Sequence, residues 1–109
     1  MQNAVLRRKR EKRYNIHMIR TRNLTLSTST PIELTIIDSV QSANTLVVQN
    51  NNDSGYIYLG TDSVSASNYG FKLFPGQGFT IELSAYSHLY AVSSAAAMTA
   101  AVMVIERAI

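Results

Sequence analysis

The sequence contains no cysteine, so neither disulfide bonds nor thiolate metal sites can stabilise this chain, and its redox compartment is not indicated. Long apolar runs are also absent. The longest, residues 95–105, falls well short of the roughly 20 residues that a membrane helix needs. The N-terminus lacks the apolar segment of a secretory signal, and its solid basic block with an acid differs from an amphipathic transit peptide. We therefore expect neither a membrane span nor secretion by that route.

Constellations of catalytic or metal-binding residues are lacking as well. His17 and His88 are far apart in the sequence and have no HxH or HxxxH partner. Asp53 and Asp62 flank a turn-rich segment, but the calcium-loop pattern of carboxylates is missing. The many serines have no GxSxG motif around them. We expect no enzyme activity, no cofactor and no metal site.

Size and composition are typical of one small domain. A chain of 109 residues accommodates one hydrophobic core, and 46% hydrophobic with 16% charged residues indicates a lightly charged surface. The charge is unevenly distributed. Residues 1–22 hold eight basic residues and one acidic residue, a net charge of +7, whereas residues 23–109 hold two basic and six acidic residues, a net charge of −4. The sequence thus predicts a basic arm on a mildly acidic body, and the arm is expected to seek an acidic partner.

The basic arm is the candidate partner-binding site. Alone in water its consecutive positive charges repel one another, so we expect the run Arg7–Arg13 to be disordered without a partner. It can neutralise nucleic-acid phosphates, clamp acidic surfaces of neighbouring subunits, or remain a solvated tail. No aromatic residue interrupts the run to stack on bases, so protein clamping is the preferred interpretation. The candidate residues are Arg7, Arg8, Lys9, Arg10, Lys12, Arg13, Arg20 and Arg22.

Short apolar runs separated by turn residues fill the rest of the chain and predict strands. A two-residue period suggests a strand at 14–20, and 23–30 is expected to be an extended connector. Further strands are predicted at 32–37, 46–48, 56–59, 71–74, 79–83, 89–92 and 101–105. The run Asn50–Gly55 is expected to join two of these strands as a hairpin, and Pro75 with Gly76 predicts a type II turn. Residues 60–70 are expected to form a surface loop, and 93–101 a loop or a single helical turn.

These patterns predict an all-β chain, a small β-sandwich or jelly-roll-like barrel with an extended basic N-terminal arm. We place the arm and its connector at residues 1–30 and the β-sandwich module at residues 31–109. Four of the six tyrosines, Tyr56, Tyr58, Tyr86 and Tyr90, are candidates for a platform that stacks on sugars or bases. Strand tyrosines more often pack in cores or interfaces, so the platform is the less favoured interpretation.

Five signals in the second half of the chain occur in a characteristic order. They are Val48-Gln49-Asn50, Tyr58-Leu59-Gly60, Gly70-Phe71-Lys72-Leu73 leading to Pro75-Gly76-Gln77, Leu89-Tyr90-Ala91-Val92-Ser93, and a closing apolar strand that ends at Glu106. This order resembles a small β module that recurs in structural proteins of tailed bacteriophages. The resemblance covers a little over half the chain and excludes the basic arm.

The resemblance implies a non-enzymatic virion protein, and we favour a capsid decoration or cement protein whose arm clamps neighbouring coat subunits. The expected partners are the major capsid protein or another virion protein, together with copies of this chain in a homo-oligomer such as a trimer. One alternative is a tail or head-fibre accessory component that binds a receptor or glycan through residues 60–70 and Tyr69. The other is a nucleic-acid-binding protein that uses the basic arm. Neither alternative involves a membrane.

Overall fold

A computed structural model describes residues 17–35, 43–84 and 86–107 of the chain. These residues form eight strands and no helix, so no described segment is a helix that could cross a membrane. The strands are β1 His17–Thr25, β2 Ile32–Glu33, β3 Asn44–Asn50, β4 Ile57–Gly60, β5 Phe71–Leu73, β6 Gly78–Leu83, β7 Tyr90–Ser93 and β8 Thr99–Arg107.

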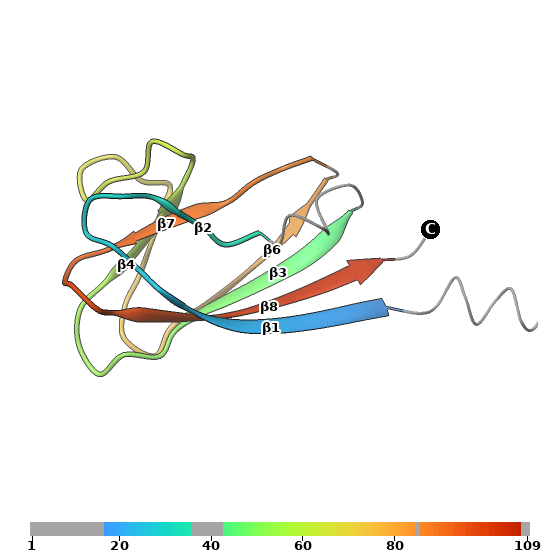
Figure 1. Cartoon of the computed structure of the whole chain (residues 1–109), viewed down its shortest axis with the longest axis horizontal. Coiled ribbons are helices and arrows are strands. Elements are labelled where there is room, and N and C mark those ends of the chain that lie inside the picture. The colour runs from blue at the N-terminus through green and yellow to red at the C-terminus, as the bar shows by residue number, and fades with distance from the viewer. Residues whose placement is uncertain (1–16, 36–42, 85, 108–109) are drawn as a thin grey trace, which may run out of the picture.

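The strands make two antiparallel sheets that pack face to face (Figure 1). Sheet A has the order β1-β8-β3-β6, and sheet B has the order β2-β7-β4-β5. The pairs β1·β8, β2·β7, β3·β6 and β4·β5 are therefore all neighbours, as in a ribbon of four antiparallel pairs rolled into two layers. This is the strand order of a jelly roll, so the predicted all-β sandwich is confirmed.

The core lies between the two sheets and follows from the two-residue period of the strands. In β3, Leu46 and Val48 are fully buried, while Val47 between them is half-buried on the opposite face. Strands β4 and β5 contribute to the core from sheet B in the same way. The buried apolar cluster consists of Leu26, Leu34, Leu46, Val48, Ile57, Leu59, Leu73, Ala91, Met98, Ala100, Val102 and Val104.

A buried amide joins the layers at one end of the sandwich. Asn50 ends β3 with no exposed surface, and its Nδ2 donates hydrogen bonds of 3.1 Å to the carbonyl oxygens of Gly55 and Leu73. Its Oδ1 accepts bonds from the backbone N and the Nδ2 of Asn52. Asn52 in turn exchanges hydrogen bonds with the backbone of Thr99 at the start of β8. All of the donors and acceptors of the Asn50 amide are satisfied, as a buried polar group requires.

The segment Asn50–Gly55 is a turn, but the prediction of a hairpin there is wrong. Strand β3 belongs to sheet A and β4 to sheet B, so the segment crosses between the layers. The type II turn at Pro75 and Gly76 is confirmed: Gln77 N donates to Phe74 O at 2.9 Å, and Gly76 has a φ of 81°. That turn also crosses between layers. Among the described connections, only β4 to β5 joins neighbours in one sheet.

The N-terminal part of the described chain differs most from expectation. Residues 23–30 were expected to be a connector, yet β1 continues to Thr25 and pairs with β8 along its whole length. The residues from 17 onward therefore belong to the sandwich, which begins before the expected boundary at 30. Strand β2 contains only Ile32 and Glu33 of the predicted strand at 32–37, whose last two residues lie outside the described part.

Candidate interaction surfaces

The candidate basic arm divides into two groups in the structure. Arg7, Arg8, Lys9, Arg10, Lys12 and Arg13 lie outside the described residues. Arg20 and Arg22 lie in β1, at the edge of sheet A, on the same side of the strand as Leu24, which packs against the core. These two arginines were expected to belong to an extended arm, but they lie in a strand of the sandwich itself.

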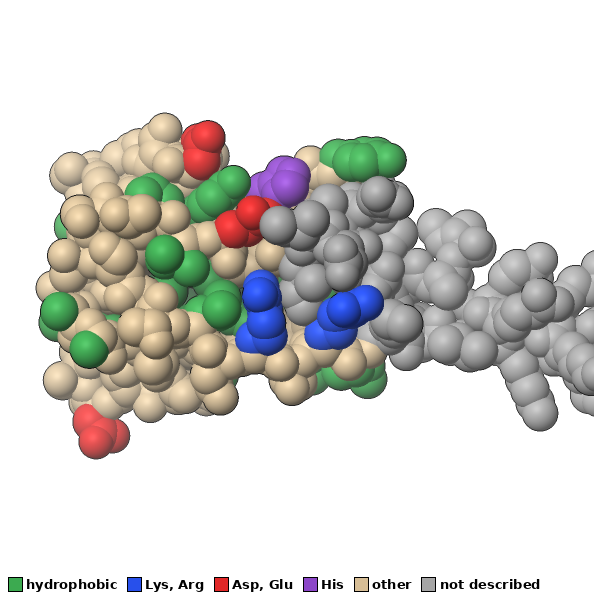
Figure 2. All heavy atoms as spheres, in the orientation of Figure 1, with side chains coloured by type: hydrophobic (Ala, Val, Ile, Leu, Met, Phe, Trp, Pro, Cys, Tyr) green, Lys and Arg blue, Asp and Glu red, His purple; other side chains and the backbone are tan. Residues whose placement is uncertain are grey.

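The charge of Arg22 acts on Glu33, which is paired with His88 at the edge of sheet B. The Nδ1 of His88 lies 2.5 Å from Oε2 of Glu33 in β2, and the Thr35 hydroxyl donates to the same oxygen at 2.5 Å. Burial raises the pKa of Glu33, but the hydrogen bonds from His88 and Thr35 and the positive charges of His88 and Arg22 outweigh it, so the pKa is lowered. Figure 2 shows basic, acidic and histidine side chains near one another on this face of the molecule.

The charge of Glu33 also reaches β7. It raises the pKa of the Tyr90 hydroxyl, with smaller contributions from burial and from Asp62. This network ties the edge strand β2 to the segment before β7, where His88 lies at the surface. Because Glu33 makes two hydrogen bonds and has a lowered pKa, it is suited to stabilising the edge of sheet B rather than to accepting a proton from a substrate.

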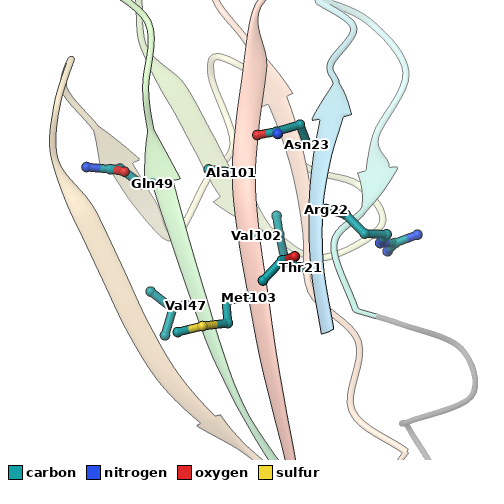
Figure 3. Close-up of a pocket in the computed structure, with 8 residues that line it drawn as sticks. All are labelled: Thr21, Arg22, Asn23, Val47, Gln49, Ala101, Val102 and Met103. Atoms are coloured by element: carbon teal, nitrogen blue, oxygen red, sulfur yellow. The ribbon is translucent and has the colours of Figure 1, made fainter. Parts of the chain in front are cut away.

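Among its described side chains, the outer face of sheet A carries one charge, at Glu82 of β6. Cross-strand rows run over it in register, and the central row joins Thr21 of β1, Met103 of β8, Val47 of β3 and Thr80 of β6. A hollow of about 370 Å³ lies over this row and the next (Figure 3). Figure 3 shows Thr21, Met103 and Val47 close together on the sheet, while Arg22 points away from them.

The outer face of sheet B is aromatic instead. A second, small cluster forms there from Tyr58, Val64 and Val92, with Tyr56 and Tyr90 packed against it. Residues 61–63 and 66–70 are exposed, as expected of a surface loop, and only Val64, with 3% of its surface exposed, anchors the loop on the sheet. Beside this cluster, the ammonium group of Lys72 lies 4.1 Å from the centre of the Tyr56 ring.

A third feature is an apolar hollow of about 300 Å³ where β6 and the loop before β7 meet the ends of β4 and β5. It is lined by Leu59, Gly60, Gly70, Phe71, Phe79, Ile81 and Leu89. Phe71 and Phe79 meet there edge to face, with their ring centres 4.6 Å apart. No charged or side-chain polar group lines this hollow, so it resembles a gap at the margin of the core rather than a site for chemistry.

The described residues contain no group of three or more His, Cys, Asp or Glu side chains that could hold a metal ion. Comparison of the sequence with models of known protein families and with curated proteins finds no match. The function of the chain must therefore be inferred from its surfaces.

Sequence reasoning identified part of the sheet B surface and missed the rest. Of the four tyrosines considered as a platform, Tyr56, Tyr58 and Tyr90 do gather on one face, whereas Tyr86 lies apart in the turn after β6. Lys72 and Phe74 were missed. The available signal was the alternation in Phe71–Phe74, which places Lys72 and Phe74 on the face opposite to the buried Leu73.

Proposed function

We propose that this chain is a non-enzymatic structural subunit of a virion, a capsid decoration or cement protein that associates with copies of itself and with coat subunits. The observation that supports this proposal most strongly is the outer face of sheet A, whose described side chains carry a single charge, at Glu82, and whose edge strand β1 follows the basic segment. Assembly through this face and clamping through the arm would make one continuous contact.

The chemistry of this face suits contact with protein. The row next to the central one joins Ile19, Ile105 and Thr45, and Ile19 is 62% exposed. Among the described side chains of the face, a charge occurs only at Glu82 on the outermost strand, opposite Thr45. Depletion of charged side chains is typical of the centre of a protein interface, and methionine, here Met103 of the central row, is enriched there. Low charge also suits a symmetric contact, because a charged side chain near the symmetry axis would face the same charge on the other copy.

The position of β1 links this face to the basic arm. Strand β1 is the edge of sheet A, and the last residue of the basic run, Arg13, precedes the first residue of the strand, His17, by four positions. Sixteen residues precede β1 and, fully extended, would span at most about 55 Å. A neighbour that covers the sheet face thus lies within reach of the arm, whose charge complements acidic protein surfaces.

Two further observations agree with the proposal without testing it. The jelly roll is an architecture of viral capsid domains, although it also occurs in lectins, so the fold is an argument by analogy. The order of turn and strand signals resembles a module of tailed-phage structural proteins. The resemblance and the fold favour the same class of protein, and the choice of decoration protein within that class rests on the arm and the sheet face.

The test in solution uses the full chain and the central row of the face. We expect the wild-type protein to self-associate as its concentration rises in sedimentation velocity. Met103→Glu would place a charge at the centre of each copy's face and should leave a monomer, whereas Lys72→Glu on sheet B should associate as the wild type does. Association of Met103→Glu equal to that of the wild type would contradict the proposal.

The test in particles addresses the arm. Deleting residues 1–13 should leave a protein that folds, with the far-ultraviolet circular dichroism of a β protein, but that no longer enters virus particles. Retained incorporation would contradict the clamp. The nucleic-acid alternative would instead give binding to random-sequence DNA that weakens steeply with added salt and disappears with the same deletion.

A further inference from the structure

The outer face of sheet B carries a continuous row of aromatic rings around one lysine, which we call the aromatic row: Tyr69, Tyr58, Lys72, Tyr56 and Phe74. Tyr69 stacks on Tyr58 with ring centres 4.9 Å apart, and Tyr58 lies directly opposite Lys72 across β4 and β5. The Lys72 ammonium group lies 4.1 Å from the Tyr56 ring and 5.3 Å from the Phe74 ring. These two rings meet edge to face at 5.2 Å. Each member therefore contacts the next.

The two ends of the row are exposed, Lys72 and Tyr56 are half-buried, and Tyr58 is buried. Phe74 has 52% of its surface exposed and Tyr69 has 44%, whereas Tyr58 between them has 8%. An exposed phenylalanine ring forgoes the stabilisation that burial in an apolar environment would provide. Packing of sheet B explains Tyr58, but it does not account for rings held in water at both ends.

The row is held rigidly from below and from the side. Tyr58 packs on Val64 and Val92, and the segment that carries Tyr69 is closed by a pair of hydrogen bonds between the backbones of Ser65 and Asn68. Gly70 N, next to Tyr69, donates to Leu59 O at 2.8 Å. At the other end, Ser94 Oγ accepts from Tyr56 N. A surface ordered in this way loses little conformational entropy when it binds a ligand.

The residues that precede Tyr69 in the sequence carry mainly hydroxyl and amide groups. Residues 61–70 read TDSVSASNYG, and the serines and asparagine flank the exposed Tyr69. Such a mixture of tyrosine, serine and asparagine is typical of binding loops, in which the rings supply rigid contact area and the small polar groups supply hydrogen bonds. The ring faces can pack on the CH groups of a sugar, and the hydroxyls and amides can bond its hydroxyl groups.

The charge on the row selects among saccharides. Lys72 is the cation of the row, and its ammonium group has donors available beyond its contact with the rings. A carboxylate on a sugar ring stacked over Tyr56 or Phe74 would meet this cation directly. A nucleic acid is less well matched, because a phosphate chain would need several cations along its path, and Asp62 lies in the neighbouring loop.

We propose that the aromatic row binds a carbohydrate chain that carries carboxylate groups, with sugar rings stacked on the exposed faces of Phe74 and Tyr69 and a carboxylate at Lys72. The inference concerns the sheet opposite to the proposed assembly face and does not depend on assembly. A virion subunit attached through sheet A would present sheet B outward.

The test uses the full chain and two forms of one polymer, polygalacturonate and its fully methyl-esterified, neutral derivative, in affinity electrophoresis. The basic arm interacts with the acid form but has no charge to meet in the ester, so binding of the ester isolates the rings. We expect the wild type to be retarded by both polymers and more by the acid. Phe74→Ala combined with Tyr69→Ala should weaken ester binding at least tenfold.

Two matched variants complete the design. Lys72→Met keeps the aliphatic stem and should bind the ester as the wild type does, while losing several-fold affinity for the acid. Tyr86→Ala removes a tyrosine outside the row that is more exposed than Tyr69, 69% against 44%, and should bind both polymers unchanged. The proposal is overturned if the wild type does not bind the ester, if the double variant binds it normally, or if Tyr86→Ala weakens binding as much as the double variant. A thermal melt of each variant checks its folding.

Discussion

The two outer faces of this sandwich are built by the same alternation of strands but present different chemistry. Sheet A presents Thr21, Val47 and Met103 in an uncharged row, whereas sheet B presents aromatic rings around Lys72. The difference follows the connections. The only described connection that joins neighbours within a sheet is the long one from β4 to β5, and it folds over sheet B. A face with little charge among its described side chains suits another protein, while separated exposed rings suit a smaller ligand.

Substitutions on the inner faces of the sheets and substitutions on the outer faces should have different effects. The inner faces of both sheets contribute to one apolar cluster, so damage there should reduce the stability of the whole sandwich. A change on one outer face should alter one interaction and leave folding nearly intact.

Adjacent residues at the end of β5 should give opposite results. Leu73 points into the core with no exposed surface, whereas Phe74 is half-exposed on the aromatic row. We expect Leu73→Ala to lower the free energy of unfolding by about 3 kcal/mol, because it leaves a cavity. Phe74→Ala should lower it by less than about 1 kcal/mol, since much of the ring is already in water. Urea denaturation measures both, and equal losses would show that Phe74 is a core residue rather than a binding residue.

Removing the buried amide between the sheets should cost nearly as much. In Asn50→Ala the carbonyl oxygens of Gly55 and Leu73 lose their partner, and so does the backbone N of Asn52. We expect a loss of about 2 to 3 kcal/mol, because unsatisfied buried groups carry a desolvation penalty. Asn51→Ala is the control: its exposed side chain accepts one bond, from the Thr99 hydroxyl, and should cost less than about 1 kcal/mol. A small effect of Asn50→Ala in urea denaturation would mean that the sheets do not depend on this amide.

Two glycines with positive φ should differ in what a methyl group meets. At Gly55, with φ of 89°, an added Cβ would lie 2.6 Å from Sδ of the buried Met98. At Gly76, with φ of 81°, it would meet nothing within 4 Å. Gly76→Ala should therefore cost only backbone strain, about 1 kcal/mol, and Gly55→Ala about 1 kcal/mol more. Melting temperatures of the two variants measure the difference, and equal values would show that Met98 moves aside freely.

The local sequence predicted where the chain turns, but not to which sheet the strand after each turn belongs. Pro75 and Gly76 require a type II turn wherever the flanking strands lead, and the structure has it. The Asn50–Gly55 run is also a turn, yet its two strands lie in different sheets. The contacts that hold this turn are remote in sequence: Asn50 bonds the carbonyl oxygen of Leu73 in β5, and the amide of Asn52 bonds the backbone of Thr99 in β8. The local pattern of apolar and turn residues does not reveal contacts between residues so far apart in the sequence.

The same limit applies to β1 and to the aromatic row. The alternation of Leu24 and Leu26 in a Ser/Thr-rich segment indicated extended chain, but its pairing with β8 depends on residues at the other end of the sequence. For the row, alternation places Tyr56 with Tyr58 and Lys72 with Phe74. Only the register of β4 on β5, with Tyr58 opposite Lys72, brings the two pairs together. Sequence reasoning therefore found candidate residues for this surface but not their arrangement.

The smallest predicted effect concerns the edge where the two sheets approach each other, at Glu33. Its pKa is lower in the folded protein than the usual 4.5, so the unfolded chain binds the proton more readily. The contribution of Glu33 to stability is therefore present above about pH 4.5 and is lost as the pH falls through the lowered pKa. We expect Glu33→Gln to lose less stability than the wild type between pH 5 and pH 3, by less than about 1 kcal/mol because the pair is partly in water.

His88→Ala should likewise make the free energy of unfolding, measured by urea denaturation, depend less on pH. It removes the strongest of the contacts that lower the pKa of Glu33. If His88→Ala keeps the wild-type profile, Thr35 and Arg22 suffice to hold the carboxylate, and His88 is not needed for its effect on stability.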